Sequence, residues 1–145
     1  MKATVTDRLV VDASIAVAWC FADERAPYTE EVLDKMIQGA EAFVPSHWPL
    51  EIVNALLQAE KRKRLTAAQA AQFLKQLEGF NITTDSTPLP RVFDWIFLEA
   101  RQQGLTAYDA AYLELALRRG LPLATLDNQL KKAAKDLGIP AAVAR

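Results

Sequence analysis

Glycine placement constrains the fold of this chain more than any other feature of its sequence. Only five glycines occur in 145 residues, and each follows a stretch in which apolar residues recur at helical spacing. A residue without a Cβ adopts the left-handed backbone conformation cheaply, so glycine often stands just past the end of a helix. We therefore predict helices over residues 29–38, 66–78, 91–103, 106–119 and 128–137, ending before Gly39, Gly79, Gly104, Gly120 and Gly138.

Two further helices end without glycine, and short apolar runs separate the helices. One helix, over 14–23, leads into Pro27, and one starts near Pro49 and ends in the basic run at 61–64. The apolar runs are 9–11, 42–44, 80–83, 121–125 and 140–144, and we expect 83–90 to be a loop. Short apolar runs that alternate with helices are typical of a parallel sheet covered on both faces. We predict an α/β fold, a three-layer α/β/α sandwich with a parallel sheet of four or five strands, in one domain over residues 1–145.

Composition excludes several classes of protein. The formal net charge is −1, so the chain is no polybasic nucleic-acid coat. It has one cysteine, Cys20, and one histidine, His47, so we expect neither an internal disulfide nor a zinc cluster. No long apolar run suggests a signal peptide or a membrane span, and a reducing cytoplasmic location is the expectation.

Four acidic residues are predicted to stand where strands end and helices begin. Asp12 and Asp127 follow apolar runs, whereas Glu51 and Asp109 lie in the first turns of helices. Each could simply cap a helix or complement its dipole. However, the helices that begin near Thr29 and Thr66 do without such an acid, so capping alone does not require all four. Ligands bind at the carboxyl ends of parallel strands, which favours a shared site.

A cluster of carboxylates calls for a cation. Like charges at one edge of a sheet raise one another's pKa values unless a positive ion neutralises them. Oxygen ligands without cysteine or histidine select Mg²⁺ or Mn²⁺ over zinc. Such a site is suited to phosphoryl transfer, in which metal ions activate water and stabilise the leaving oxygen.

Four sequence blocks, in order, resemble the PIN domain, and most closely its VapC-type ribonuclease toxins. They are VVDAS, PLEIVNAL, TAYDAAYLELA and LATLDNQL, and the resemblance extends from Leu9 to Leu137. By position, Asp12, Glu51, Asp109 and Asp127 match the catalytic, metal-binding acids of that family. Ser14, Asn54 and Thr125 match polar residues that support them, whereas Asn128 stands where some members have a further acid.

The resemblance implies a Mg²⁺-dependent endoribonuclease, with Mn²⁺ as a possible substitute, that hydrolyses RNA phosphodiester bonds with an activated water. Asp12 and Asp109 would hold the tighter ion, and Glu51 and Asp127 would complete the site. It also implies a toxin that inhibits translation and growth, forms a homodimer and binds a VapB-type antitoxin. An apolar groove near the first helices would suit the antitoxin.

Basic and aromatic residues have less specific interpretations. Basic residues at the end of the helix that starts near Pro49, and in the last predicted helix, are candidates for contacts with the RNA backbone. They are Lys61, Arg62, Lys63, Arg64, Lys131, Lys132 and Lys135. We expect Arg118 and Arg119 only to complement a helix dipole. Most aromatic side chains should lie in the core; Phe93 and Phe97 form an i, i+4 pair, with Trp95 on another face, which suggests either deep packing or a partner surface.

Two alternative functions remain open from the sequence. Asp12 could be the nucleophile of an aspartate-based phosphatase, although such enzymes usually have a second aspartate where this chain has Ser14. The chain could also be a catalytically silent binding module with the same fold. Metal titration distinguishes a nuclease from a set of helix-capping acids.

Overall fold

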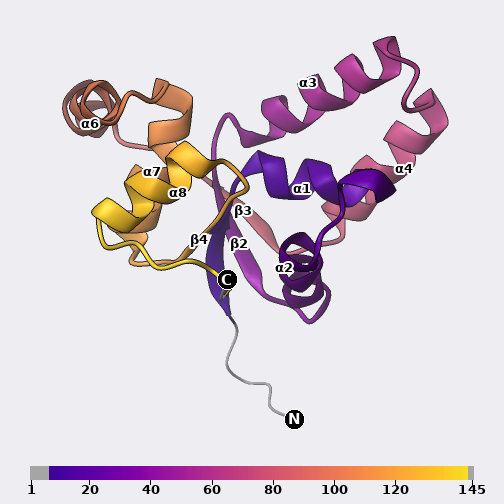
Figure 1. Cartoon of the computed structure of the whole chain (residues 1–145), viewed down its shortest axis with the longest axis horizontal. Helices are drawn as coiled ribbons and strands as arrows, with labels where there is room; N and C mark the ends of the chain where they lie inside the picture. Colours follow the sequence, from indigo (N-terminus) through magenta and orange to yellow (C-terminus); the bar gives the residue numbers. More distant parts are fainter. Residues whose placement is uncertain (1–6, 144–145) are drawn as a thin grey trace.

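The fold is built on a short parallel sheet with helices on both sides. The computed structural model describes residues 7–143. Within them, β1 (Arg8–Val11), β2 (Glu41–Pro45), β3 (Ile82–Asp85) and β4 (Leu123–Ala124) are all parallel, in the order β3-β2-β1-β4. In Figure 1 the strands run between α1–α4 on the right and α6–α8 on the left. The predicted α/β arrangement is confirmed, with four strands.

The helices lie close to their predicted positions. The first group comprises α1 (Ala13–Cys20), the 3₁₀ turn η1 (Ala22–Glu24), α2 (Pro27–Ile37), α3 (Trp48–Lys61) and α4 (Ala67–Glu78). The second comprises α5 (Leu89–Arg91), the π-helical segment η2 (Val92–Ile96), α6 (Phe97–Gln103), α7 (Ala107–Arg119) and α8 (Asn128–Asp136). The predicted helix over 91–103 is thus helical throughout but contains a π-helical stretch between α5 and α6.

Three details of the prediction are wrong. Gly79 has a φ of −78° rather than a positive φ, because the chain leaves α4 through two further i→i+3 hydrogen bonds, from Gly79 N and Phe80 N. Residues 83–85 belong to β3 rather than to a loop, since they pair with 43–45 of β2. The run at 140–143 adds no strand, and Ala141 makes only an isolated bridge to Leu123; residue 144 lies outside the described residues.

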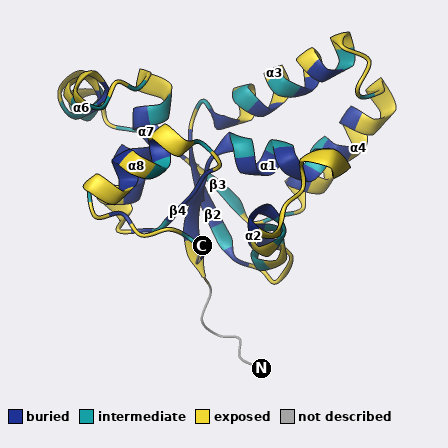
Figure 2. Cartoon of the chain, viewed as in Figure 1, coloured by how far each residue is buried: buried dark blue, intermediate teal, exposed yellow. Residues whose placement is uncertain are grey.

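The core lies around the central strands. Leu9, Val10 and Val11 of β1 are buried, and so are Phe43 and Val44 of β2. Figure 2 shows most of β1, β2 and β4 and the inner helix faces in dark blue, whereas β3 is largely teal. Most predicted core aromatics are buried, but Phe93, Phe97 and Tyr108 are 65%, 56% and 63% exposed. Because both phenylalanines are mostly exposed, the deep-packing interpretation of the Phe93–Phe97 pair is wrong.

A buried ionic network joins α7 to the end of β3. The fully buried Glu114 accepts hydrogen bonds from Arg118 and Arg91, and Asp85 accepts them from Arg118 and Arg119. Burial acts to raise the pKa of Asp85 and of Glu114, but the arginine hydrogen bonds outweigh it and hold both pKa values below their usual range. Arg118 and Arg119 therefore do more than complement a helix dipole, which corrects that expectation.

No helix among residues 7–143 combines the length and apolar character needed to cross a bilayer.

Candidate active site

Asp12 occupies the carboxyl end of the central strand β1, directly before α1. Its backbone N–H donates to the carbonyl of Ala124 at 2.9 Å, which brings the ends of β1 and β4 together. The carboxylate is almost completely buried, and it makes no capping bond to α1. Its Oδ2 accepts hydrogen bonds from Thr125 Oγ1 at 2.5 Å and from Ser14 Oγ at 3.1 Å. The capping interpretation of Asp12 is therefore wrong.

Ser14 and Thr125 hold the two strand ends in register as well as the Asp12 carboxylate. The Ser14 hydroxyl accepts the N–H of Leu126 at 3.2 Å, and the Thr125 hydroxyl accepts the N–H of Asp127 at 3.0 Å. Each hydroxyl thus accepts one backbone hydrogen bond and donates its proton to Asp12. This fixes the orientation of a carboxylate that has no cationic partner among these contacts.

Glu51, in the first turn of α3, is held by an unexpected partner, Tyr112 of α7. The phenol donates to Glu51 Oε1 at 2.5 Å and accepts the N–H of Ala13, the first residue of α1, at 3.3 Å. His47 Nε2 lies 3.6 Å from the same Glu51 oxygen. Tyr112 is fully buried, and the sequence assigned it only to the core. The signal was its position three residues after Asp109, on the same face of the helix.

Asp109 lies in the first turn of α7, which Thr106 caps by accepting the Asp109 N–H at 3.1 Å. Burial raises the pKa of the Asp109 carboxyl, and the charges of Asp12 and Asp127 raise it further. The pKa of Glu51 is raised as well, first by burial and then by Asp12 and Asp109, against lowering by Tyr112 and His47. The four acids therefore form one electrostatically coupled cluster.

Asp127 and Asn54 differ from the other candidates. Asp127 does cap a helix: its Oδ1 accepts the N–H groups of Gln129 and Leu130 at 2.8 and 3.1 Å. The capping interpretation is therefore confirmed for this acid. Asp127 also contributes to the cluster, because its charge raises the pKa of Asp109. Asn54 is exposed on α3, one turn after Glu51.

The donor set suits a hard divalent cation, although the side chains are not drawn together around one. All four acids offer oxygen ligands, and their mutual repulsion favours a positive ion between them. Within residues 7–143, however, no three acid, histidine or cysteine side chains converge closely enough to hold a metal ion. Glu51 is turned to Tyr112 and Asp127 to the backbone of α8.

The basic candidates lie at different distances from the cluster. Lys61 is ten residues along α3 from Glu51, roughly 15 Å at the rise of an α-helix. Arg64 is held by Asp23 and Glu24, and its guanidinium lies 4.3 Å from the centroid of the Phe21 ring. On α8, Lys132 forms an ion pair with Asp136 at 3.2 Å, and Lys131 lies beside Tyr28.

Comparisons with known proteins agree with this architecture. Residues 9–136 match the PIN domain. The chain is 32% identical over 123 residues to Ribonuclease VapC3 of Pyrobaculum aerophilum, and this alignment covers 85% of this chain and 92% of the relative. It is 35% identical over 99 residues to Exonuclease VapC9 of the same organism, and this second alignment covers 67% of this chain and 71% of the relative.

Solved structures support the fold. PAE2754 from Pyrobaculum aerophilum superposes with a TM-score of 0.68 at 24% identity, covering 91% of this chain and 87% of that one. FitAcB from Neisseria gonorrhoeae superposes with a TM-score of 0.63 at 15% identity, covering 92% of this chain and 95% of that one. With the family match over most of its length and a relative above 30% identity, this chain belongs to the PIN-domain family, in its VapC-type branch.

Proposed function

We propose that this protein is a Mg²⁺-dependent endoribonuclease that acts as the toxin of a toxin–antitoxin pair and inhibits translation in the cytoplasm. The observation that carries the proposal is the coupled acid cluster around Asp12 at the carboxyl end of the sheet. The name of the relative, Ribonuclease VapC3, supports RNA as the substrate. A site with only oxygen ligands supports Mg²⁺ or Mn²⁺ over zinc.

In this proposal Asp12 and Asp109 hold the tighter ion, and Glu51 and Asp127 complete the site. A bound divalent ion supplies charge neutralisation and lowers the pKa of water at the scissile phosphate. Ser14 and Thr125 keep the Asp12 carboxylate in one orientation through their hydroxyl donors. Tyr112 does the same for Glu51, and because it also bonds to Ala13 N it ties α3, α7 and the start of α1 together.

Two surfaces are proposed for protein partners. A cleft of about 620 Å³ between α1 and α4 and a hollow of about 400 Å³ between α2 and α4 share Trp19 and Phe73 as walls. We place the VapB-type antitoxin in the cleft and the adjoining hollow together. The sequence led us to expect an apolar groove, but the lining of the cleft between α1 and α4 is mostly polar. For the homodimer we propose the exposed apolar residues of α3 and of η2 and α6: Leu50, Val53, Leu57, Phe93 and Phe97.

The test of cleavage uses a circular single-stranded RNA and its linear form, with Mg²⁺ or with EDTA. We expect the wild type to open the circle only with the metal, and Asp12→Asn to lose this activity. Asp34→Asn is the matched control, because Asp34 is an exposed acid on α2, on a different element from any of the four acids. Equal rates for wild type and Asp12→Asn would refute the assignment of the site.

The same assay decides between this proposal and a second one. The name Exonuclease VapC9 favours attack from a chain end. An exonuclease would degrade linear RNA and leave the circle intact, whereas an endonuclease opens both. A catalytically silent module would cleave neither, and an aspartate-based phosphatase would also leave the phosphodiester bonds intact, because it transfers a phosphoryl group from a phosphomonoester to Asp12 and then to water.

A further inference from the structure

A pocket beside the acid cluster has no role in the mechanism proposed above. It has a volume of about 440 Å³ and lies between α2, β4, α8 and the segment that follows α8. Its lining is mostly apolar, and Leu123 of β4 and Ala141 of the last segment are among its walls. Pockets of about 300–1,000 Å³ with apolar walls and a few polar groups are typical of small-ligand sites.

Thr125 connects this pocket to the acid cluster. It lines the pocket, and its hydroxyl is the group that donates to Asp12 Oδ2 at 2.5 Å. The pocket therefore begins one side chain away from the carboxylate at the centre of the site. A group bound in the pocket would be separated from the Asp12 carboxylate by the side chain of Thr125.

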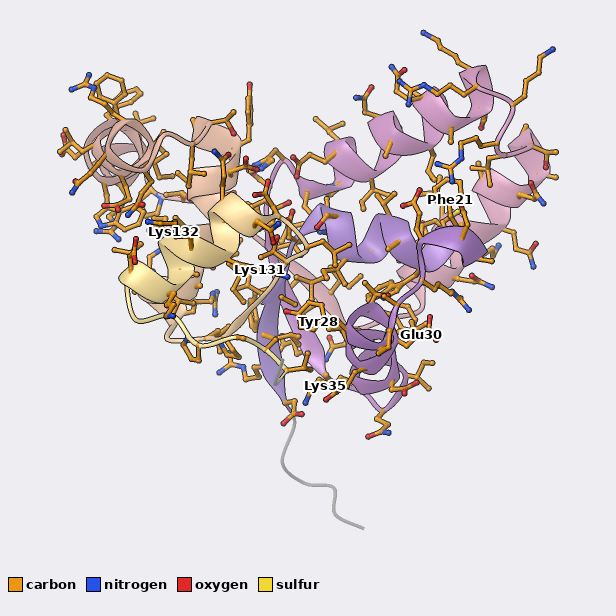
Figure 3. The ribbon with its side chains drawn as sticks, viewed as in Figure 1. Phe21, Tyr28, Glu30, Lys35, Lys131 and Lys132 are labelled. Atoms are coloured by element: carbon orange, nitrogen blue, oxygen red, sulfur yellow. The ribbon has the colours of Figure 1, made fainter. Side chains whose placement is uncertain are left out.

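Two of the polar side chains that line the pocket are cationic. Lys131 and Lys135 of α8 both line it, and Lys131 Nζ lies 5.4 Å from the centroid of the Tyr28 ring, which forms another wall. Figure 3 shows Tyr28 and Lys131 near each other, between α2 and α8. An aromatic ring, aliphatic walls and two ammonium groups complement a ligand that has a flat apolar part and a negative charge.

We propose that this pocket binds one unstacked nucleotide of the RNA, next to the bond that is cut, with its base among the apolar walls and its phosphate at Lys131 and Lys135. The inference rests on the proposed RNA cleavage and adds a subsite that selects bases by size and shape, because most of its walls are apolar. Single-stranded RNA is recognised by bases that leave the stack and enter such sites. The volume suits one nucleotide rather than a helical segment of a partner protein.

The test separates the pocket from the acids by filling it or by changing its charge. Ala141→Trp fills the pocket from an exposed position, and Ala68→Trp places the same side chain on an exposed position of α4. Lys135→Gln removes a pocket charge, and Lys75→Gln removes an exposed charge from α4. The affinity for fluorescein-labelled single-stranded RNA of random sequence is measured in EDTA at several salt concentrations, and the cleavage ends are sequenced in Mg²⁺.

We expect Ala141→Trp to weaken RNA binding by about tenfold, the loss typical of one base contact, and to change the base preference beside the cut. Lys135→Gln should lower the slope of log affinity against log salt by about 0.7, the value for one phosphate contact in single strands. The two control variants should behave like the wild type. Since Lys135 is exposed, that variant tests the pocket even if Ala141→Trp fails to fold.

Three results would overturn the inference. If both pocket variants bind and cleave RNA as the wild type does, the pocket is no subsite, while the nuclease assignment stands. If a polyglutamate peptide displaces RNA from the wild type but not from Lys135→Gln, the pocket responds to negative charge alone and the nucleotide assignment is wrong. If the wild type neither binds nor cuts RNA, the proposed function fails, and the subsite fails with it.

Discussion

Removing the Tyr112 hydroxyl should destabilise the protein even without metal. Tyr112→Phe keeps the buried ring but removes the donor to Glu51 Oε1 and the acceptor for the Ala13 N–H. A hydrogen bond to a charged group contributes about 1.5–3 kcal/mol, and a buried donor left without a partner costs about 1–3 kcal/mol. Glu51 is only half-buried and can form a hydrogen bond with water instead. The expected loss in the free energy of unfolding is therefore about 2 kcal/mol, less than the two contributions added together.

Thermal unfolding in EDTA measures this effect. For a chain of this length about 2 kcal/mol corresponds to a Tm lower by about 4–8 °C. Tyr108→Phe is the matched control, because Tyr108 lies on the same helix but is 63% exposed, and its Tm should change by no more than about 2 °C. If Tyr112→Phe melts like Tyr108→Phe, the hydroxyl does not hold α1, α3 and α7 together, and our view of how Glu51 is positioned is wrong.

Three further predictions concern charge. Glu114→Ala should lower the free energy of unfolding in urea by about 2 kcal/mol, because Arg118 loses one of its two buried carboxylate partners and Arg91 loses its hydrogen bond to Glu114, whereas the exposed Glu78→Ala should have little effect. The folded pKa values of Asp85 and Glu114 are lowered, so the stability that they contribute is present above their unfolded values of about 4 and is lost as the pH falls further; a urea midpoint that stays constant from neutral pH to about pH 3 would contradict this. The folded pKa of Asp109 is raised, chiefly by burial, so its ionised form destabilises the fold at neutral pH; Asp109→Asn should raise the Tm in EDTA and reduce the further rise caused by Mn²⁺, and a lower Tm in EDTA would count against the acid cluster.

Local signals in the sequence were sufficient for most of the helices. Gly104 and Gly120 have positive φ values of 69° and 67°, as expected for residues that end helices. The strand at 82–85 was harder to predict, because ITTD contains three polar residues and looks like part of the loop that follows. Its pairing with β2 and the arginine partners of Asp85 make it a strand, and both come from distant parts of the chain.

The candidate site was predicted only in part. Asp12 and Asp127 could be placed at strand ends because each follows an apolar run, and the parallel sheet brings such ends to one edge. No local pattern distinguishes Asp127, which caps a helix, from Asp12, which does not. That difference depends on Thr125 and Ser14, which meet Asp12 only when β1 and β4 lie side by side.

By itself the sequence determined the alternation of helices and strands and the parallel sheet, and it singled out four acids as candidates, because periodicity, glycine positions and residue chemistry are local properties. The tertiary structure alone decided which groups meet. The Tyr112–Glu51 bond joins residues 61 positions apart, and the Thr125–Asp12 bond joins residues 113 apart. Contacts over such separations depend on how the helices pack on the sheet, and the burial that follows from this packing also sets the pKa values of the site.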